Sequence, residues 1–177
     1  MNVQAKGEIV ATDLAIPETA KKLRGLVLGY FVSRAVQVAA ELDLAGHLSQ
    51  SSKDGAELAA LCAAHAPTLT RVMRMLVSVG VFAESNGRFS NNELSELLRG
   101  DVPQSVRAWA RMFGADFQWS SVQALPHSVK TGEPGFQRVF GEELFSYLSH
   151  HPDDARLFDE AMVSGSELMN GAIVSAY

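Results

Sequence analysis

Apolar residues dominate the chain between residues 24 and 48, where polar side chains occupy only one side of a helical wheel. Each residue of an α-helix advances about 100° around the axis, so one arc of about 100° holds Ser33, Arg34, Gln37 and Glu41. The rest of the circumference is apolar: Leu26, Val27, Leu28, Tyr30, Phe31, Val32, Ala35, Val36, Val38, Ala39 and Leu42. A surface helix of a monomer needs a single apolar stripe. The pattern therefore predicts a helix packed between its own domain and a second subunit, with a fully buried core helix of a monomer as the alternative.

A membrane span would need about 20 predominantly apolar residues in a row, and the polar arc interrupts such a run. We therefore expect no membrane partner. Pro17 and Glu18 suit the first turn of the long helix. Before them the sequence has neither the apolar core nor the basic flank of a signal peptide. Residues 1–16 are expected to form a mobile arm or a docking segment.

Turn-forming residues divide the next part of the chain into short helices. Residues 43–48 suit a single helical turn. Asp54 and Glu57 have the spacing of a capping box, which predicts a helix over 55–64. A second helix over 67–80 begins with a proline, repeats apolar residues at helical spacing and stops at a glycine.

The only β-strand pattern in the chain follows these helices. Residues 81–84 and 88–90 flank Asn86 and Gly87, the pair that most readily adopts the left-handed angles of a tight hairpin turn. Helix, turn, helix and hairpin in this order are typical of a winged helix.

A winged helix raises the hypothesis of DNA binding. The second helix would read the duplex, and it has only Arg71 and Arg74 as basic side chains, with Arg88 in the wing. Fifteen basic against twenty acidic residues give a net charge of −5 and a pI near 5.5. Phosphate binding requires a clustered basic excess, so we expect no nucleic-acid partner.

Three further helices are expected in the second half. Ser90 or Asn91 is predicted to cap a helix that Gly100 ends, and Pro103 is predicted to open the next. The last helix has Pro152 in its first turn and two aspartates that complement its dipole, with Ser149 or His151 as candidate caps. Its apolar stripe consists of Phe158, Ala161, Met162, Gly165, Leu168, Met169, Ala172 and Ile173, in which the small residues allow close approach of another element.

Composition excludes several classes of site. With 177 residues, 47% of them hydrophobic, the chain can bury one or two cores. Cys62 is the single cysteine, which rules out an intrachain disulfide or a cysteine-based zinc site and favours a reducing, cytoplasmic location. The five histidines include no pair spaced for metal binding, so no metal site is expected.

The order and spacing of motifs in the second half resemble a known family. After the segment GVFAESNGRFSNNELSELLRGD come Trp119, Leu125, Val129, Thr131-Gly132, Pro134, Phe136, Phe140-Gly141, Leu144-Phe145, Tyr147-Leu148, Pro152, Phe158 and Met162. From Pro17 onwards the chain is similar to the N-terminal part of class I S-adenosylmethionine-dependent O-methyltransferases of the bacterial small-molecule and plant phenolic type.

The resemblance implies a winged-helix dimerisation domain followed by a Rossmann-like domain that holds the methyl donor. A glycine-rich turn behind an apolar strand would mark the donor site, and none of the glycines here forms one. Gly132 and Gly135 are better explained as a loop beside Pro134. We therefore expect a truncated chain, a proteolytic remnant or a separately encoded half, without bound S-adenosylmethionine and without activity on its own.

The resemblance also implies an acceptor-lining role for the last helix. Phe158 and Met162 match the family's Phe-x-x-x-Met pair, Ser166 matches a small polar position, and Asp159 replaces the usual asparagine. Weaker candidates for the same role are Trp119, Met112 and Phe113, because aromatic and methionine side chains offer flat, polarisable surface to a planar molecule. Core packing is the alternative for each. No catalytic residue is implied here, because the family's basic histidine lies in the other domain.

The sequence thus predicts a mainly α fold. A mobile arm (1–16) precedes a winged-helix dimerisation domain (17–100) and a helical acceptor-lining segment (101–177), and the Rossmann-like catalytic domain is absent. The predicted function is the homodimeric, acceptor-binding part of an O-methyltransferase acting on a small aromatic hydroxyl compound, with S-adenosylmethionine as cofactor of the complete enzyme. The alternative is a non-catalytic dimerisation module or a winged-helix transcriptional regulator.

Overall fold

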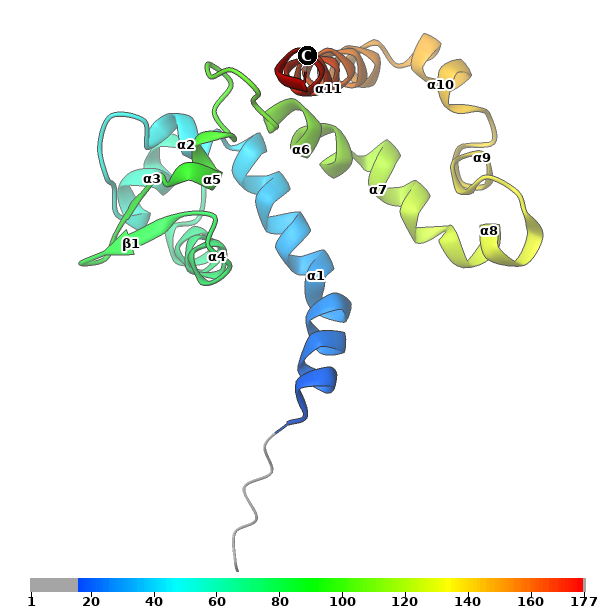
Figure 1. The fold of residues 1–177 in the computed structure, drawn as a ribbon. Coiled ribbons are helices and arrows are strands. Elements are labelled where there is room, and N and C mark those ends of the chain that lie inside the picture. Colours follow the sequence, from blue (N-terminus) through cyan, green and yellow to red (C-terminus); the bar gives the residue numbers. More distant parts are fainter. Residues whose placement is uncertain (1–15, 177) are drawn as a thin grey trace, which may run out of the picture. The chain divides into compact units, whose positions relative to one another are not determined.

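The computed structural model describes residues 16–176, with side chains as far as Ser166 (Figure 1). The chain divides into two compact units, Met1–Tyr30 and Phe31–Tyr177, and the helix α1 (Glu18–Glu41) contributes residues to both. The arm expected over residues 1–16 lies, except for Ile16, outside the described residues. The same holds for four side chains of the predicted final stripe, those of Leu168, Met169, Ala172 and Ile173.

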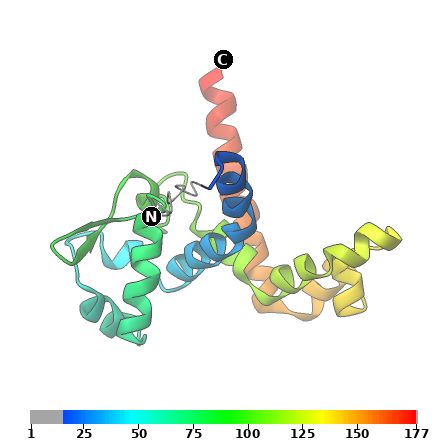
Figure 2. The same cartoon turned by 90° about the horizontal axis from the view of Figure 1, so that it is seen from below.

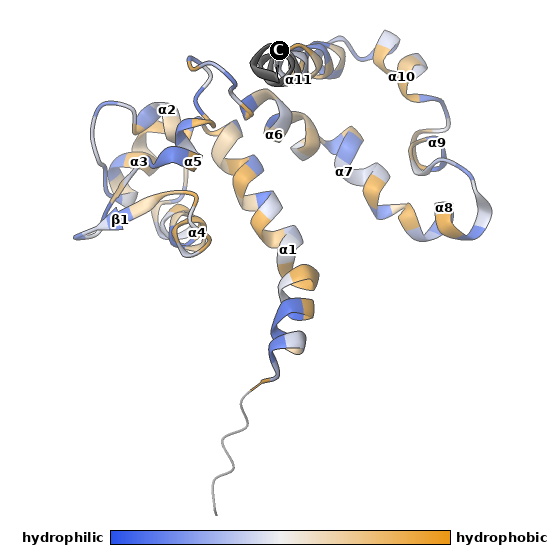
Figure 3. Ribbon diagram, viewed as in Figure 1, coloured by the Kyte–Doolittle hydropathy of each residue, from blue (hydrophilic) through white to orange (hydrophobic). Residues whose placement is uncertain are grey.

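Hydrophobic residues follow α1 along most of its length, as predicted (Figure 3). In the first unit Leu26 and Val27 are 72% and 65% exposed, and in the second unit Phe31 is 51% exposed. Within the polar arc Ser33, Arg34 and Glu41 are exposed. Gln37 is buried, and its amide donates to Ser33 Oγ at 3.2 Å. Over residues 16–176, no helix has the length and apolarity needed to cross a membrane.

A first hydrophobic core lies in the second unit, between the end of α1, three helices and one hairpin. The elements are α2 (Leu44–His47), α3 (Gly55–Leu61), α4 (Ala66–Ser78), β1 (Ala83–Ser85) and β2 (Arg88–Ser90). Their largest buried side chains are Leu44, Leu58, Leu69, Met73, Leu76, Phe82 and Phe89. The predicted helix, turn, helix and hairpin are therefore present, although α3 ends three residues earlier than predicted.

The predicted capping box at the start of α3 is complete. Asp54 Oδ1 accepts hydrogen bonds from the backbone N–H groups of Ala56 and Glu57, at 2.8 and 2.9 Å. Glu57 Oε2 in turn accepts one from the backbone N–H of Asp54 at 2.7 Å. The bond from the Glu57 N–H is the main cause that lowers the pKa of the Asp54 carboxyl. These bonds satisfy N–H groups that have no partner within the helix.

The hairpin also forms at the predicted turn. Asn86 and Gly87 have φ angles of 51° and 75°, the left-handed values that a two-residue hairpin turn requires. Glu84 pairs with Phe89 in the antiparallel register, and Phe89 also exchanges backbone hydrogen bonds with Lys53. The side chain of Phe89 therefore closes the first core from the hairpin side.

Two predicted helix starts are wrong. Helix α5 (Glu93–Glu96) is capped by Asn92, whose Oδ1 accepts from two backbone N–H groups, because the amide of Asn91 instead donates to Ala45 O in α2. Helix α6 (Arg107–Gly114) begins four residues after Pro103, since Gln104 has a left-handed φ of 59° that a right-handed helix cannot contain.

Helices α7 to α10 lie together in both views of the chain (Figure 2). They are α7 (Asp116–Gln123), α8 (Leu125–Thr131), α9 (Gly135–Phe140) and α10 (Leu144–His150), followed by α11 (Pro152–Ala176). Gly132 ends α8 with φ 79°. Gly135 is not in a loop as expected but opens α9, where an added Cβ would lie 2.7 Å from Ser121 O of α7. Glycine therefore permits the close contact of α7 with α9.

A second core joins these helices to α6 and α11. Its fully buried members are Met112, Phe117 and Ala161, and the partly buried aromatic residues around them are Phe136, Phe140, Tyr147 and Phe158. Helix α6 contacts both cores, because Ala110 packs on the first and Ala108 on the second. The structure is mainly α with one short hairpin and a further helical segment, which confirms the predicted fold class.

Candidate acceptor surface

Helices α6 and α11 approach each other closely at one glycine. A Cβ added to Gly165 would lie 2.7 Å from Nε1 of Trp109, so that any larger residue would displace the indole. Ala161 is fully buried one turn before Gly165 and packs in the second core with Met112. This contact between small residues and a large aromatic ring is the close approach that the final stripe predicted.

Beside this contact lie two groups of partly exposed side chains, Trp109 with Phe113 on α6 and Phe145 with Phe158 and Met162 on α10 and α11. We call the two groups together the aromatic strip. The rings of Trp109 and Phe113 lie 5.4 Å apart, one helical turn from each other on α6. Phe158 and Met162 are likewise one turn apart on α11, and the ring of Phe145 meets that of Phe158 edge-on at 6.1 Å. The exposed fractions are 37% for Trp109, 42% for Phe113, 73% for Phe145 and 38% for Met162.

Three of the predicted acceptor-lining residues lie on the aromatic strip: Phe113, Phe158 and Met162. Ser166 follows on the same helix, exposed, and its hydroxyl donates to the Met162 carbonyl at 2.9 Å. Flat and polarisable side chains of this kind can hold a planar molecule by stacking and by sulfur–aromatic contact.

The other two predicted residues lie elsewhere. Met112 is 2% exposed in the second core, so it supports the strip from beneath rather than lining it. Trp119 is half-buried on α7, and the guanidinium carbon of Arg34 lies 5.4 Å from its ring centroid. This is a cation–π contact between α1 and α7.

Sequence reasoning missed two members of the strip, Trp109 and Phe145. Trp109 precedes Phe113 by four residues, and Gly165 provides room for a large ring, so a pairing of α6 with α11 was open to inference. Phe145 depends on how α10 folds back against α11, which residue spacing does not reveal.

Two clefts lie on other faces of α6 and α11, and none of the strip residues lines them. The first, of about 400 Å³, has a mainly charged lining that includes Arg34, Glu41, Arg111, Asp116, Asp154 and Glu160. The second, of about 840 Å³, lies between α6, α11 and the loop before α6, and its lining includes Ser105, Ala108, Pro152, Asp159 and Val163. Asp159 therefore faces a cleft rather than the strip.

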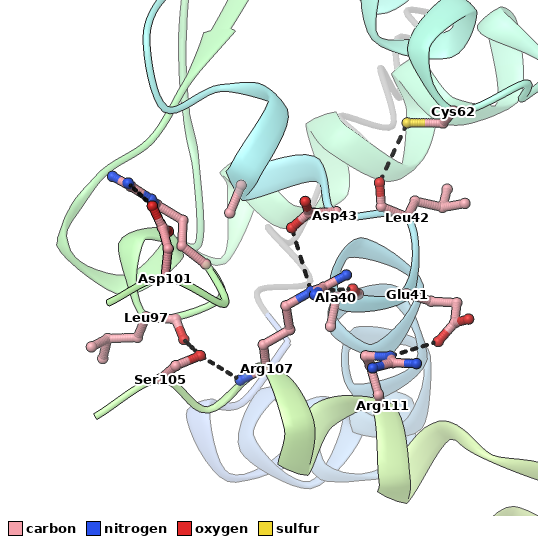
Figure 4. Close-up of polar contacts among 12 residues, drawn as sticks. Ala40, Glu41, Leu42, Asp43, Cys62, Leu97, Asp101, Ser105, Arg107 and Arg111 are labelled. Carbon is pink, nitrogen blue, oxygen red and sulfur yellow. Dashed lines mark hydrogen bonds and ion pairs between the residues drawn. The ribbon is translucent and has the colours of Figure 1, made fainter. Parts of the chain in front are cut away.

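Titratable groups with shifted pKa values hold the fold together. Burial is the main cause that raises the pKa of Tyr147, and its hydroxyl also donates to Asp154 at 3.0 Å. Burial likewise raises the pKa of Cys62, whose thiol donates to Leu42 O in the first core (Figure 4). Over the described residues, no three His, Cys, Asp or Glu side chains group to hold a metal ion.

The arginines of the predicted DNA reader are partly neutralised. Arg74 forms an ion pair with Glu84 at 3.3 Å, and Arg88 forms one with Glu57 at 2.8 Å. Arg71 donates to Thr68 Oγ1 on its own helix. Each ion pair reduces the positive charge available to phosphates. Weak DNA binding stays a prediction, which a gel-shift assay at physiological salt can check.

Comparison with known proteins bears directly on this arrangement of helices. The family described as the O-methyltransferase dimerisation domain matches residues 25–101. Residues 25–101 are an O-methyltransferase dimerisation domain. The match contains α2 to α5 and the hairpin, which confirms the predicted dimerisation domain.

Relatives of this chain extend the likeness beyond the dimerisation domain. The phenazine O-methyltransferase PhzM of Lysobacter antibioticus is 39% identical over 153 residues, which cover 86% of this chain and 45% of that protein. The crystal structure of LaPhzM matches with a TM-score of 0.85 and 37% identity over 92% of this chain and 48% of that one.

A third relative was solved with ligands. NcsB1 from neocarzinostatin biosynthesis, in complex with S-adenosylmethionine and 2-hydroxy-5-methyl naphthoic acid, has a TM-score of 0.69 and 32% identity over 78% of this chain and 43% of that one. The chain therefore spans about half the length of the relatives that it matches.

Proposed function

We propose that this chain is the dimerisation and acceptor-binding part of a methyltransferase that transfers the methyl group of S-adenosylmethionine to a hydroxyl of a small aromatic molecule. The observation that carries the proposal is the family match over residues 25–101, together with a likeness to relatives that covers 86% of the chain in sequence and 92% in structure. Those relatives include enzymes named for a phenazine and solved with a naphthoic acid. The aromatic strip has the flat, half-exposed surface that such planar acceptors need.

The described residues do not fit the methyl donor. A nucleoside is commonly held where a strand enters a glycine-rich turn at a helix N-terminus. The glycines with positive φ among the described residues, Gly80, Gly87, Gly132 and Gly141, follow helices or form the hairpin turn. We therefore assign donor binding and proton removal to residues beyond those described, and derive no chemical step from this chain.

Within this proposal the chain orients the acceptor and excludes water from one of its faces. Holding an acceptor in a reactive geometry contributes several kcal/mol to such reactions. Trp109 and Phe113 would contact one part of the planar molecule and Phe158 with Met162 another. Ser166 and the half-buried Trp119 have supporting roles at most, because neither is part of the strip.

The homodimer would form through the apolar surface of α1. Its exposed large side chains are Leu23, Leu26, Val27, Leu28, Tyr30 and Phe31. An exposed apolar surface of this size is rare in a monomer and marks an interface. Two copies that pack through it would bury roughly 2,000 Å² or more, as obligate dimers do.

Two measurements test the proposal. Light scattering of the purified chain at micromolar concentration should give the mass of a dimer, and Phe31→Asp should cause aggregation; a wild-type monomer would contradict the dimer. The complete enzyme, expressed from its full coding sequence, should methylate a hydroxylated phenazine or naphthoate with S-adenosylmethionine, as seen by product mass. This chain alone should show no saturable heat with micromolar S-adenosylmethionine, and turnover by it alone would place the chemistry here instead.

A further inference from the structure

The surface of α6 that faces α1 carries a reciprocal pair of arginine contacts. The last carbonyls of a helix lack donors within that helix. Nε of Arg107 donates to Ala40 O near the end of α1, at 2.9 Å, and Arg34 Nη1 donates to Gly114 O at the end of α6, at 2.5 Å (the first bond appears in Figure 4). Each helix therefore supplies the cation that the negative end of the other's dipole favours.

These contacts occur where the two helices are closest. A Cβ added to Gly114 would lie 2.9 Å from Cβ of Gln37, so only glycine fits there without displacing α1. Arg107 also pairs with Asp43 at 3.4 Å, just past the end of α1. Its side chain is 25% exposed, so water screens these contacts only in part. Helix α6 is thereby fixed to α1 at both of its ends.

A third arginine continues the contact from α1 to α11. Arg111 Nε lies 3.3 Å from Glu41 Oε2 at the end of α1, and its Nη1 lies 3.4 Å from Glu160 Oε2 on α11. Ser164 Oγ, one turn after Glu160, donates to Ser105 O just before α6. The residues of α11 between and beside these anchors include Met162 of the aromatic strip.

We infer that Arg34, Arg107 and Arg111 are positioning residues of the acceptor site, because they fix α6 between the dimerisation helix α1 and the acceptor helix α11. The inference rests on the proposed function. Trp109 and Phe113 belong to α6, whereas Phe158 and Met162 belong to α11, so the shape of the strip depends on the angle between the two helices. The arginines set that angle from the α1 side without touching the strip.

The energies favour a geometric role over a stabilising one. Exposed ion pairs contribute little to stability, and Glu41 and Glu160 are 64% and 46% exposed. Loss of Arg111 should therefore leave the chain folded. A shift of about 1 Å in a surface that orients an acceptor can nevertheless impair binding strongly.

Steady-state kinetics of the complete enzyme test the inference. Arg111→Glu should raise the acceptor KM at least fivefold, with kcat and the KM for S-adenosylmethionine within twofold of wild type and the dimer mass unchanged. Arg111→Lys, which keeps a cation between Glu41 and Glu160, should keep the acceptor KM within threefold of wild type. A purely structural role predicts a lower kcat or melting temperature with KM unchanged, and that result would overturn the inference.

Arg99→Gln is the matched control. Among the described residues, the Arg99 guanidinium bonds Glu96 and Asp101, which lie beside it in the chain and outside α1 and α11. Its acceptor KM should equal that of wild type. An equal rise of the acceptor KM in Arg99→Gln and Arg111→Glu would show that the loss of any surface arginine has this effect, and would contradict the inference.

A spectroscopic readout separates this inference from the proposed function. In a Trp119→Phe background Trp109 is the remaining tryptophan, and its ring lies against Gly165 across the α6–α11 contact. Arg111→Glu should shift its emission to longer wavelength as the contact loosens, whereas Arg111→Lys should leave the emission unchanged. If the enzyme methylates no aromatic acceptor but the Trp109 emission shifts, the proposed function is wrong and the effect of Arg111 on the α6–α11 contact is supported. Unchanged emission would overturn the coupling.

Discussion

The two cores of this chain differ in what surrounds them. The first, around Leu58, Met73 and Phe89, is enclosed by its own helices and hairpin, so its large side chains lie fully inside. The second, around Phe117, borders the aromatic strip, whose exposed fractions range from 37% for Trp109 to 73% for Phe145, with Phe158 partly buried. A closed core stabilises a module, whereas a half-open aromatic surface is available to another molecule. Helix α6 takes part in both.

Truncation in the closed core should have the largest effect on stability. Phe89→Ala removes a ring with no exposed surface and should lower the free energy of unfolding by about 3–5 kcal/mol, because a cavity remains. Phe145→Ala, which removes a ring that is 73% exposed, should change it by about 0.5 kcal/mol or less. Urea unfolding curves measure both, and similar losses for the two variants would erase the distinction between core and strip.

Crowding the contact between α6 and α11 should come next. Gly165→Val forces its side chain into the indole of Trp109 and should destabilise the chain by about 1–3 kcal/mol. In the double variant with Trp109→Ala the clashing indole is absent, so the losses of stability of the two single variants should not be additive. A double-mutant cycle from thermal unfolding measures the coupling. Strictly additive losses would mean that the two residues do not meet.

Opening the strip should affect acceptor use more than stability. In the complete enzyme Met162→Ala should lower kcat/KM for the acceptor. The loss of transition-state stabilisation should be about 1–3 kcal/mol, the scale of burying one apolar side chain. Val163→Ala is the control, since Val163 is next in sequence but lines the 840 Å³ cleft instead of the strip. A loss of kcat/KM in Val163→Ala but not in Met162→Ala would indicate that the acceptor binds in that cleft.

The smallest expected effect is a pH dependence at the cap of α3 in the closed module. The pKa of Asp54 is lowered from its usual 3.8, mainly by the bond from the Glu57 N–H, so the ionised form stabilises the fold above that value. This contribution should be lost as the pH falls through the lowered pKa. Asp54→Asn keeps a cap that does not titrate. Its unfolding midpoint should therefore depend less on pH than that of wild type as the pH is lowered from about 5 to about 2. If the unfolding midpoints of wild type and Asp54→Asn changed with pH in the same way, the cap would not be the source of the pH dependence.

Local sequence determined the elements whose causes are local. The capping box of Asp54 with Glu57 and the left-handed turn at Asn86 and Gly87 require only neighbouring residues, and both formed as predicted. The apolar excess of α1 and the place of Gly165 in the final stripe were also legible, because helical periodicity fixes where each residue lies around the helix axis. These patterns, together with the family resemblance, were sufficient for the fold class.

Tertiary structure decided what depends on distant partners. Asn91 does not cap α5, because its side chain is held against α2 by the hydrogen bond from its amide nitrogen to the carbonyl oxygen of Ala45, 46 residues earlier. Trp119 on α7 contacts Arg34 of α1 rather than the strip. Met112 lies in the second core, because α6 turns that face toward α11 and the helices around it. Spacing along the chain places residues on one helix face, but which neighbour that face meets is set by long-range packing, and so are the arginines that hold α6 in place.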